Sequence, residues 1–217
     1  MATLIESAPF KGASLSNAHQ MLEQAHDYLV SCVKANSPAS PVNSRSWAID
    51  EKRLDVQIAP SIGGKTKPSI IGKSSEKFGE LINILATVER LIDAIEWFQQ
   101  QANFSNLSVR ECHPSTSSTP GSCDLMLEDE YRNLLVLCEV SDIVAGGAKT
   151  KERSDLKNLG VKPKFPSPFR PPHLFLCVSP EMAIVCTAPR RKWHVKNYKY
   201  QQHPTNGPNR TVLLEII

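Results

Sequence analysis

Apolar residues recur at helical spacing in two long segments of the chain. Between residues 17 and 33 they fall at every third or fourth position, which predicts a helix with one apolar face. The pattern is stronger over residues 75–101, where the apolar face is formed by Phe78, Leu81, Ile82, Leu85, Val88, Leu91, Ile92 and Ile95. Two amphipathic helices are therefore expected, and Glu89 and Glu96 fall at the margin of the second apolar face.

Shorter apolar runs after residue 106 predict β-strands. Residues 107–112 form a candidate strand, and the apolar runs 124–127 and 134–140 flank a polar turn, as in a hairpin. The run 134–140 is apolar throughout, so we expect it in the middle of its sheet. Residues 173–178, 182–187 and 211–217 are predicted as further strands, residues 151–159 as a short helix and residues 54–58 as a weak strand. This order predicts an α/β fold, a mixed central β-sheet flanked by helices.

Length and composition indicate a globular protein. The 217 residues are 41% hydrophobic and 22% charged, enough for one domain with a core, or one domain and an appendage. We divide the chain into a helical and loop region, residues 1–74, and an α/β core with a basic C-terminal segment, residues 75–217. No apolar run has transmembrane length and no signal peptide is evident, so we expect a cytoplasmic protein without membrane contact.

The six cysteines are scattered and none forms a CxxC pair. Buried, reduced thiols are the expected state. A zinc site made of Cys112, His113 and Cys123 is the alternative, but it lacks the paired spacing of known zinc sites.

Basic residues gather in the C-terminal third, although the net charge is only +3. Phosphates bind arginine and lysine, and exposed aromatic rings stack on bases. A candidate nucleic-acid-binding segment therefore contains Arg190, Arg191, Lys192, Trp193, Lys196 and Lys199. The alternative is a solvated loop that its aromatic residues anchor to the body. Either interpretation leaves a cationic surface that suits a polyanionic partner.

Two carboxylates stand at matching ends of the predicted hairpin. Asp124 opens the first strand, and Glu139 lies near the end of the second. Antiparallel pairing would bring these two ends together, and two carboxylates at one sheet end can hold a hard divalent cation. Each residue also has a plain structural interpretation, since Asp124 alone suits a turn and Glu139 alone suits an ion pair with a buried arginine.

With the long helix before it, this hairpin resembles the PD-(D/E)xK nuclease superfamily over about residues 75–185. The resemblance implies a restriction-endonuclease-like core in which Asp124 and Glu139 bind Mg²⁺ or Mn²⁺. It also implies that the main-chain carbonyl of Val140 is a further ligand. A glutamate from the preceding helix often joins such a site, and Glu96 or Glu89 would take that place here.

The chain departs from the family pattern at two positions. Cys123 stands where proline is common, and Ser141 stands where a lysine usually orients or activates the attacking water. A serine hydroxyl carries no charge and has too high a pKa to serve as a base. Lys149 and Lys151, in the loop after the strand, are the nearest replacements, and Asp142 adds another carboxylate at the strand end.

The resemblance implies a divalent-metal-dependent endonuclease of the type II restriction kind, which hydrolyses phosphodiester bonds in duplex DNA. Such enzymes usually act as dimers, so a homodimer is expected. The first alternative is a catalytically decayed DNA-binding or scaffold module on the same fold, which the serine at position 141 favours. The second is a protein-interaction subunit without a nucleic-acid partner.

Overall fold

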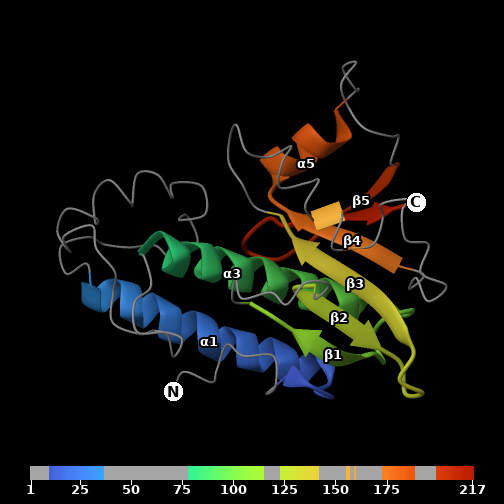
Figure 1. The fold of residues 1–217 in the computed structure, drawn as a ribbon, viewed down its shortest axis with the longest axis horizontal. Helices are drawn as coiled ribbons and strands as arrows, with labels where there is room; N and C mark the ends of the chain where they lie inside the picture. The colour runs from blue at the N-terminus through green and yellow to red at the C-terminus, as the bar shows by residue number, and fades with distance from the viewer. Residues whose placement is uncertain are drawn as a thin grey trace.

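The computed structural model describes residues 10–36, 78–114, 123–141, 155–156, 159, 173–188 and 199–217 (Figure 1). For residues 32–36 and 78–83 it describes the backbone and not the side chains. The predicted strand at residues 54–58 and most of the predicted helix at residues 151–159 lie outside these ranges. The boundary between residues 74 and 75 lies outside them as well, so the division of the chain into two regions stays a prediction.

Three helices are described: α1 (Leu15–Asn36), α3 (Phe78–Gln100) and α5 (Pro180–Thr187). The first two confirm the helices expected from apolar periodicity. Helix α1 is capped by Ser14, whose Oγ accepts the Asn17 N–H at 3.2 Å. None of the helices within the described ranges is long and apolar enough to cross a membrane.

The strand predicted at residues 182–187 is wrong, because this segment belongs to helix α5. Ser179 caps the helix by accepting the Met182 N–H at 3.2 Å, and Pro180 occupies its first turn. A short apolar run has no period that separates a buried strand from a buried helix. The preceding Ser-Pro pair was the local signal that favoured the helix.

Within the described part of the chain, six strands form one mixed sheet in the order β1-β2-β3-β4-β6-β5. Strands β1, β2 and β3 are antiparallel neighbours, β3 and β4 are parallel, and β4, β6 and β5 are antiparallel. Strand β3 lies inside the sheet, as its apolar sequence predicted. The bounds are Ser108–Cys112 for β1, Leu125–Glu128 for β2, Leu134–Val140 for β3, His173–Val178 for β4, Tyr200–Pro204 for β5 and Val212–Ile216 for β6.

Strand β5 had no counterpart in the sequence prediction. Its residues are polar, and Gln201 and Gln202 are exposed at the edge of the sheet. An edge strand buries little surface, so it shows no strong apolar pattern. Long-range pairing with β6 therefore makes this segment a strand.

Each face of the sheet packs against different helices. Helices α1 and α3 lie side by side over one face (Figure 1), where Phe98 of α3 meets Phe175 of β4. Helix α5 packs on the other face, against the alternate β4 residues Leu174, Leu176 and Val178. The expected α/β architecture with a mixed, helix-flanked sheet is thus confirmed, and α1 shares one core with α3.

Five cysteines are described with their side chains, and all are buried thiols outside any disulfide: Cys112, Cys123, Cys138, Cys177 and Cys186. The prediction of buried, reduced thiols is confirmed for them. Cys112 packs in the core beneath α3, whereas Cys123 packs in the core beneath α5. Within the described ranges, no group of three or more His, Cys, Asp and Glu side chains can hold a metal ion, so the alternative zinc site is not formed there.

Candidate functional site

The hairpin joins Asp124 to the end of β3. Leu125 pairs with Cys138 across the hairpin, and the Val140 N–H donates to Asp124 Oδ2 at 2.7 Å. The Asp124 carboxylate thus serves as the acceptor for the Val140 N–H, the role that a main-chain carbonyl of a neighbouring strand usually has in a sheet. The predicted meeting of the two strand ends is therefore confirmed, and the chemical role of the carboxylates stays a prediction.

Glu139 and Ser141 lie at this end of β3 and are both buried. Glu139 is 3% exposed and Ser141 is 0% exposed. Because Cys138 and Val140 pack beneath α3, strand alternation places Glu139 on the face that α5 covers. The Ser141 N–H donates to the Cys177 carbonyl at 2.8 Å, while its Oγ has no hydrogen-bond partner among the described groups.

The buried thiol of Cys123 is influenced by three acidic side chains. Burial raises the pKa of its thiol, and the charges of Glu139 and Asp124 raise it further, together with hydrogen bonding to Glu139. The charge of Asp155 acts in the same direction. The thiol therefore stays protonated and suits a neighbouring carboxylate as a donor. Three carboxylates act on one thiol beside the strand end.

Asp155 is a component that the sequence interpretation did not include. It is fully buried in the short helical turn at residues 155–156, and Leu156 beside it packs in the core beneath α5. Its only local signal was an acidic position within the short helix predicted at residues 151–159. Its burial depends on how that turn docks against the sheet, which local sequence does not encode.

Glu89 and Glu96 of α3 lie on the opposite side of the sheet from Glu139. Glu96 is half-buried on α3, and this helix packs on the face that Val140 contacts. Glu89 is buried and its Oε1 lies 3.2 Å from His26 Nε2 of α1. The expectation that Glu96 or Glu89 joins the strand-end pair has no support in this arrangement.

Several predicted site residues lie outside the described residues, and their roles stay predictions. They are Lys149 and Lys151, the two candidates to replace the missing lysine, the extra carboxylate Asp142, and the basic and aromatic residues Arg190, Arg191, Lys192, Trp193 and Lys196. Lys199 is described. It is exposed directly before edge strand β5, and its carbonyl accepts the Ile217 N–H at 3.0 Å.

The strand end supplies oxygen ligands of the kind that Mg²⁺ and Mn²⁺ prefer. These are the carboxylates of Asp124 and Glu139, with the Val140 carbonyl as the ligand that the family resemblance adds. The buried Ser141 hydroxyl, which has no partner in the described part of the chain, lies at the same strand end. These oxygen ligands are thus of the kind that a hard cation binds. Two carboxylate side chains contribute, and no third ligating side chain clusters with them among the described residues.

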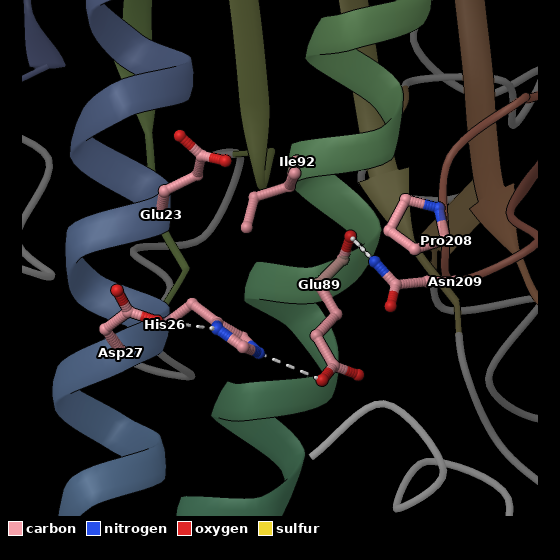
Figure 2. Close-up of a pocket in the computed structure, with 7 residues that line it drawn as sticks. All are labelled: Glu23, His26, Asp27, Glu89, Ile92, Pro208 and Asn209. Carbon is pink, nitrogen blue, oxygen red and sulfur yellow. Dashed lines mark hydrogen bonds and ion pairs between the residues drawn. The ribbon is translucent and has the colours of Figure 1, made fainter. Parts of the chain in front are cut away.

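A second polar site lies between α1 and α3 (Figure 2). His26 of α1 contacts Glu89 of α3, and its Nδ1 lies 3.6 Å from the neighbouring Asp27 carboxylate. Hydrogen bonding to Glu89 is the largest cause that raises the pKa of His26. Burial raises the pKa of Glu89, although the contact with His26 opposes that effect.

This pair predicts a stability that falls as pH rises. A folded-state pKa above the ordinary 6.5 means that the stabilisation from His26 is complete below 6.5 and is lost as pH rises through the folded value. The raised pKa of Glu89 has the same sign, since the folded state again holds the proton longer. We expect the free energy of unfolding, measured by urea denaturation across about pH 5 to 8, to fall less steeply in His26→Gln.

The control for the loss of an imidazole from α1 is His19→Gln, since His19 contacts Glu23 of its own helix at 3.6 Å. It should retain the wild-type slope. A His26→Gln protein whose unfolding free energy keeps the full wild-type pH dependence would contradict the proposed linkage.

Comparison with known proteins adds no assignment to these two sites. No family model matches the chain. No curated protein and no solved structure matches it either. The strand-end carboxylates and the His26–Glu89 site are therefore the features that bear on the function of this α/β protein.

Proposed function

We propose that this protein is a divalent-metal-dependent DNA endonuclease of the PD-(D/E)xK type, similar to type II restriction enzymes. The observation that carries the proposal is the 2.7 Å hydrogen bond from the Val140 N–H to Asp124 Oδ2. It holds one carboxylate against the strand that carries Glu139. The order of a long helix, a strand, this hairpin and a parallel crossover to β4 also supports the resemblance.

Asp124, Glu139 and the Val140 carbonyl would hold Mg²⁺ or Mn²⁺. A bound divalent cation lowers the pKa of a water molecule and neutralises charge on the phosphate. The chain holds the Asp124 carboxylate in place through the Val140 N–H, so this ligand needs no rearrangement. The apolar core beneath α5 surrounds Cys123 and limits the access of bulk water to this strand end.

Ser141 would position a water molecule and would not remove its proton. Its hydroxyl can both donate and accept a hydrogen bond, but it carries no positive charge. In this proposal Lys149 or Lys151 supplies the positively charged side chain that the family usually has at position 141. The segment from Arg190 to Lys199 binds phosphates by charge, and a homodimer cuts both strands.

A second candidate function is a catalytically decayed DNA-binding or scaffold module on the same fold. The burial of the site favours it, because Glu139 is 3% exposed and Ser141 is 0% exposed. Hydrogen bonding between Cys123 and Glu139 occupies part of the ligand set. A phosphodiester would need an opening at this strand end, whereas a binding module would not.

Cleavage and binding assays separate these functions. Supercoiled plasmid and phage DNA are incubated with the protein and Mg²⁺ or Mn²⁺, beside an EDTA control. We expect nicked or linear products with metal alone. If neither metal gives products but the protein binds duplex DNA in a salt-sensitive way, the nuclease proposal is wrong and the decayed DNA-binding module is favoured. Absence of both cleavage and binding would exclude each function and leave the protein-interaction subunit.

A further inference from the structure

A cavity of about 380 Å³ lies between α1, α3 and the turn that joins β5 to β6 (Figure 2). Helix α1 contributes Glu23, His26 and Asp27, and α3 contributes Glu89. Ligand sites for small molecules span roughly 300–1,000 Å³, so the cavity is large enough for a small ligand. It lies beside α1 and α3, on the opposite face of the sheet from Glu139.

The charge that lines this cavity is negative. Among the described residues, three carboxylates and one imidazole line it and neither lysine nor arginine belongs to its lining, although Arg90 donates to the carbonyl of the lining residue Asn209. The Glu89 side chain is only 4% exposed at the bottom, and that of Asp27 is 88% exposed at the rim. An anion such as a DNA phosphate is disfavoured here, and a cation is attracted.

Asn209 belongs to the lining, and its side-chain amide is held in a fixed orientation. Asn209 Nδ2 donates to the Glu89 main-chain oxygen at 3.0 Å and to Asp93 Oδ1 at 3.1 Å. These two acceptors fix which way the amide faces. Asn209 Oδ1 is then left buried and without a hydrogen-bond partner among the described groups. Figure 2 shows the amide nitrogen directed at the Glu89 main chain and the oxygen directed away from it.

The turn that holds Asn209 is fastened to α3. Asp93 is fully buried and accepts hydrogen bonds from the Thr211 N–H and the Thr211 hydroxyl, at 3.3 and 2.7 Å. Arg90 of the same helix donates to the Asn209 carbonyl. The acceptors of the cavity are therefore held in place before any ligand arrives, which reduces the entropy lost on binding.

We propose that this cavity binds a small organic cation through a primary ammonium or guanidinium group. Such a head group carries several N–H donors, and the lining offers carboxylate oxygens as acceptors. A bare metal ion is a poorer match, because no group of three or more acidic, His or Cys side chains within the described ranges converges on one point. The inference is independent of nuclease activity.

The probes are Nα-acetyl-L-argininamide (argininamide below) and 1,5-diaminopentane, titrated into the full-length protein by calorimetry. Nα-acetyl-L-citrullinamide (citrullinamide below) is the neutral isostere of this argininamide, and Mn²⁺ alone tests for a metal site. We expect both cations to bind with dissociation constants below about 1 mM. A blocked Gly-Arg-Gly peptide separates a free ligand from a partner's side chain, and it should bind more weakly, because the flanking chain does not fit the cavity.

Glu89→Gln should weaken argininamide binding at least about tenfold. The matched control is Glu181→Gln, which removes an exposed carboxylate from α5, outside the cavity. The double variant Glu23→Gln/Asp27→Asn changes only rim residues that are largely exposed. It provides the same test if Glu89→Gln does not fold, and it should also reduce the affinity.

Four results would overturn the proposal. The first is equal affinity for citrullinamide and argininamide, and the second is unchanged affinity in both cavity variants. The third is Mn²⁺ that displaces argininamide at a lower concentration than diaminopentane, which would make this a metal site. If the blocked peptide binds more tightly than argininamide, the cavity binds an arginine side chain of a protein partner and not a small free cation.

Discussion

Asp124→Asn is expected to slow metal-dependent DNA cleavage strongly while the fold remains intact. Asparagine keeps an oxygen that can accept the Val140 N–H, now bonded to Asp124 Oδ2 at 2.7 Å. It removes the negative charge that would hold the cation. We expect the cleavage rate to fall by a factor on the order of 10²–10³, comparable to the loss of one group that stabilises a transition state. Plasmid nicking in Mg²⁺ measures it.

Asp124→Ala separates the two roles of this carboxylate. It removes the charge and also leaves the Val140 N–H without its acceptor, so it should lose stability as well as activity. Glu111→Gln on β1 is the matched control, since it neutralises a half-exposed carboxylate of the same sheet. Asp124→Asn and Glu139→Gln proteins that both cut like the wild type would disprove the site assignment, even if the wild type is a nuclease.

Asp93→Ala is expected to cause the largest loss of stability. Asp93 is fully buried and accepts hydrogen bonds from the Thr211 N–H, the Thr211 hydroxyl and the Asn209 amide. Each donor left unsatisfied in the interior costs about 1–3 kcal/mol, and the sum is not additive. We expect the free energy of unfolding to fall by about 3–5 kcal/mol, measured by urea denaturation followed by circular dichroism.

Asp129→Ala is the control for Asp93→Ala. Asp129 accepts as many hydrogen bonds as Asp93 but lies exposed, whereas Asp93 is buried. Asp129 also accepts three hydrogen bonds, from the Tyr131 N–H, the Asn133 N–H and the Asn133 amide, but it lies exposed in the hairpin turn. Water replaces these bonds on truncation, so the loss should be clearly smaller. Equal losses in the Asp93 and Asp129 variants would show that burial of Asp93 does not set its contribution.

Gly207→Ala tests the same network from the turn. A Cβ at this position would lie 2.1 Å from Asp93 Oδ1, too close for any real contact. The turn or the carboxylate must then move, which costs about 1–3 kcal/mol. A Gly207→Ala protein as stable as the wild type would show that the turn is not fastened against α3 as the structure indicates.

The carboxylate pair was predictable because it depends on a local element. A hairpin of known register brings the start of its first strand to the end of its second, so Asp124 and Glu139 had to meet once 124–140 paired. The face that Glu139 occupies was not predictable. Glu96 was expected at the same site, and the sheet separates it from Glu139, because α3 packs on the other face.

The His26–Glu89 cavity could not be seen in the sequence. Its lining comes from α1, α3 and the turn before β6, and Asn209 is 120 residues from Glu89 along the chain. Glu89 stood out only as a polar position at the margin of an apolar helical face. Nothing local indicated that a histidine of another helix would cover it.

The sequence by itself determined the elements whose stability comes from their own apolar pattern: helices α1 and α3, the hairpin β2–β3 and the buried strand β4. Tertiary structure alone decided the elements and sites that need a distant partner. Helix α5 and edge strand β5 are too short for a decisive period. The burial of Asp155 and the His26–Glu89 contact depend on which surfaces dock. Docking is set by long-range packing of side chains, and local periodicity carries no information about it.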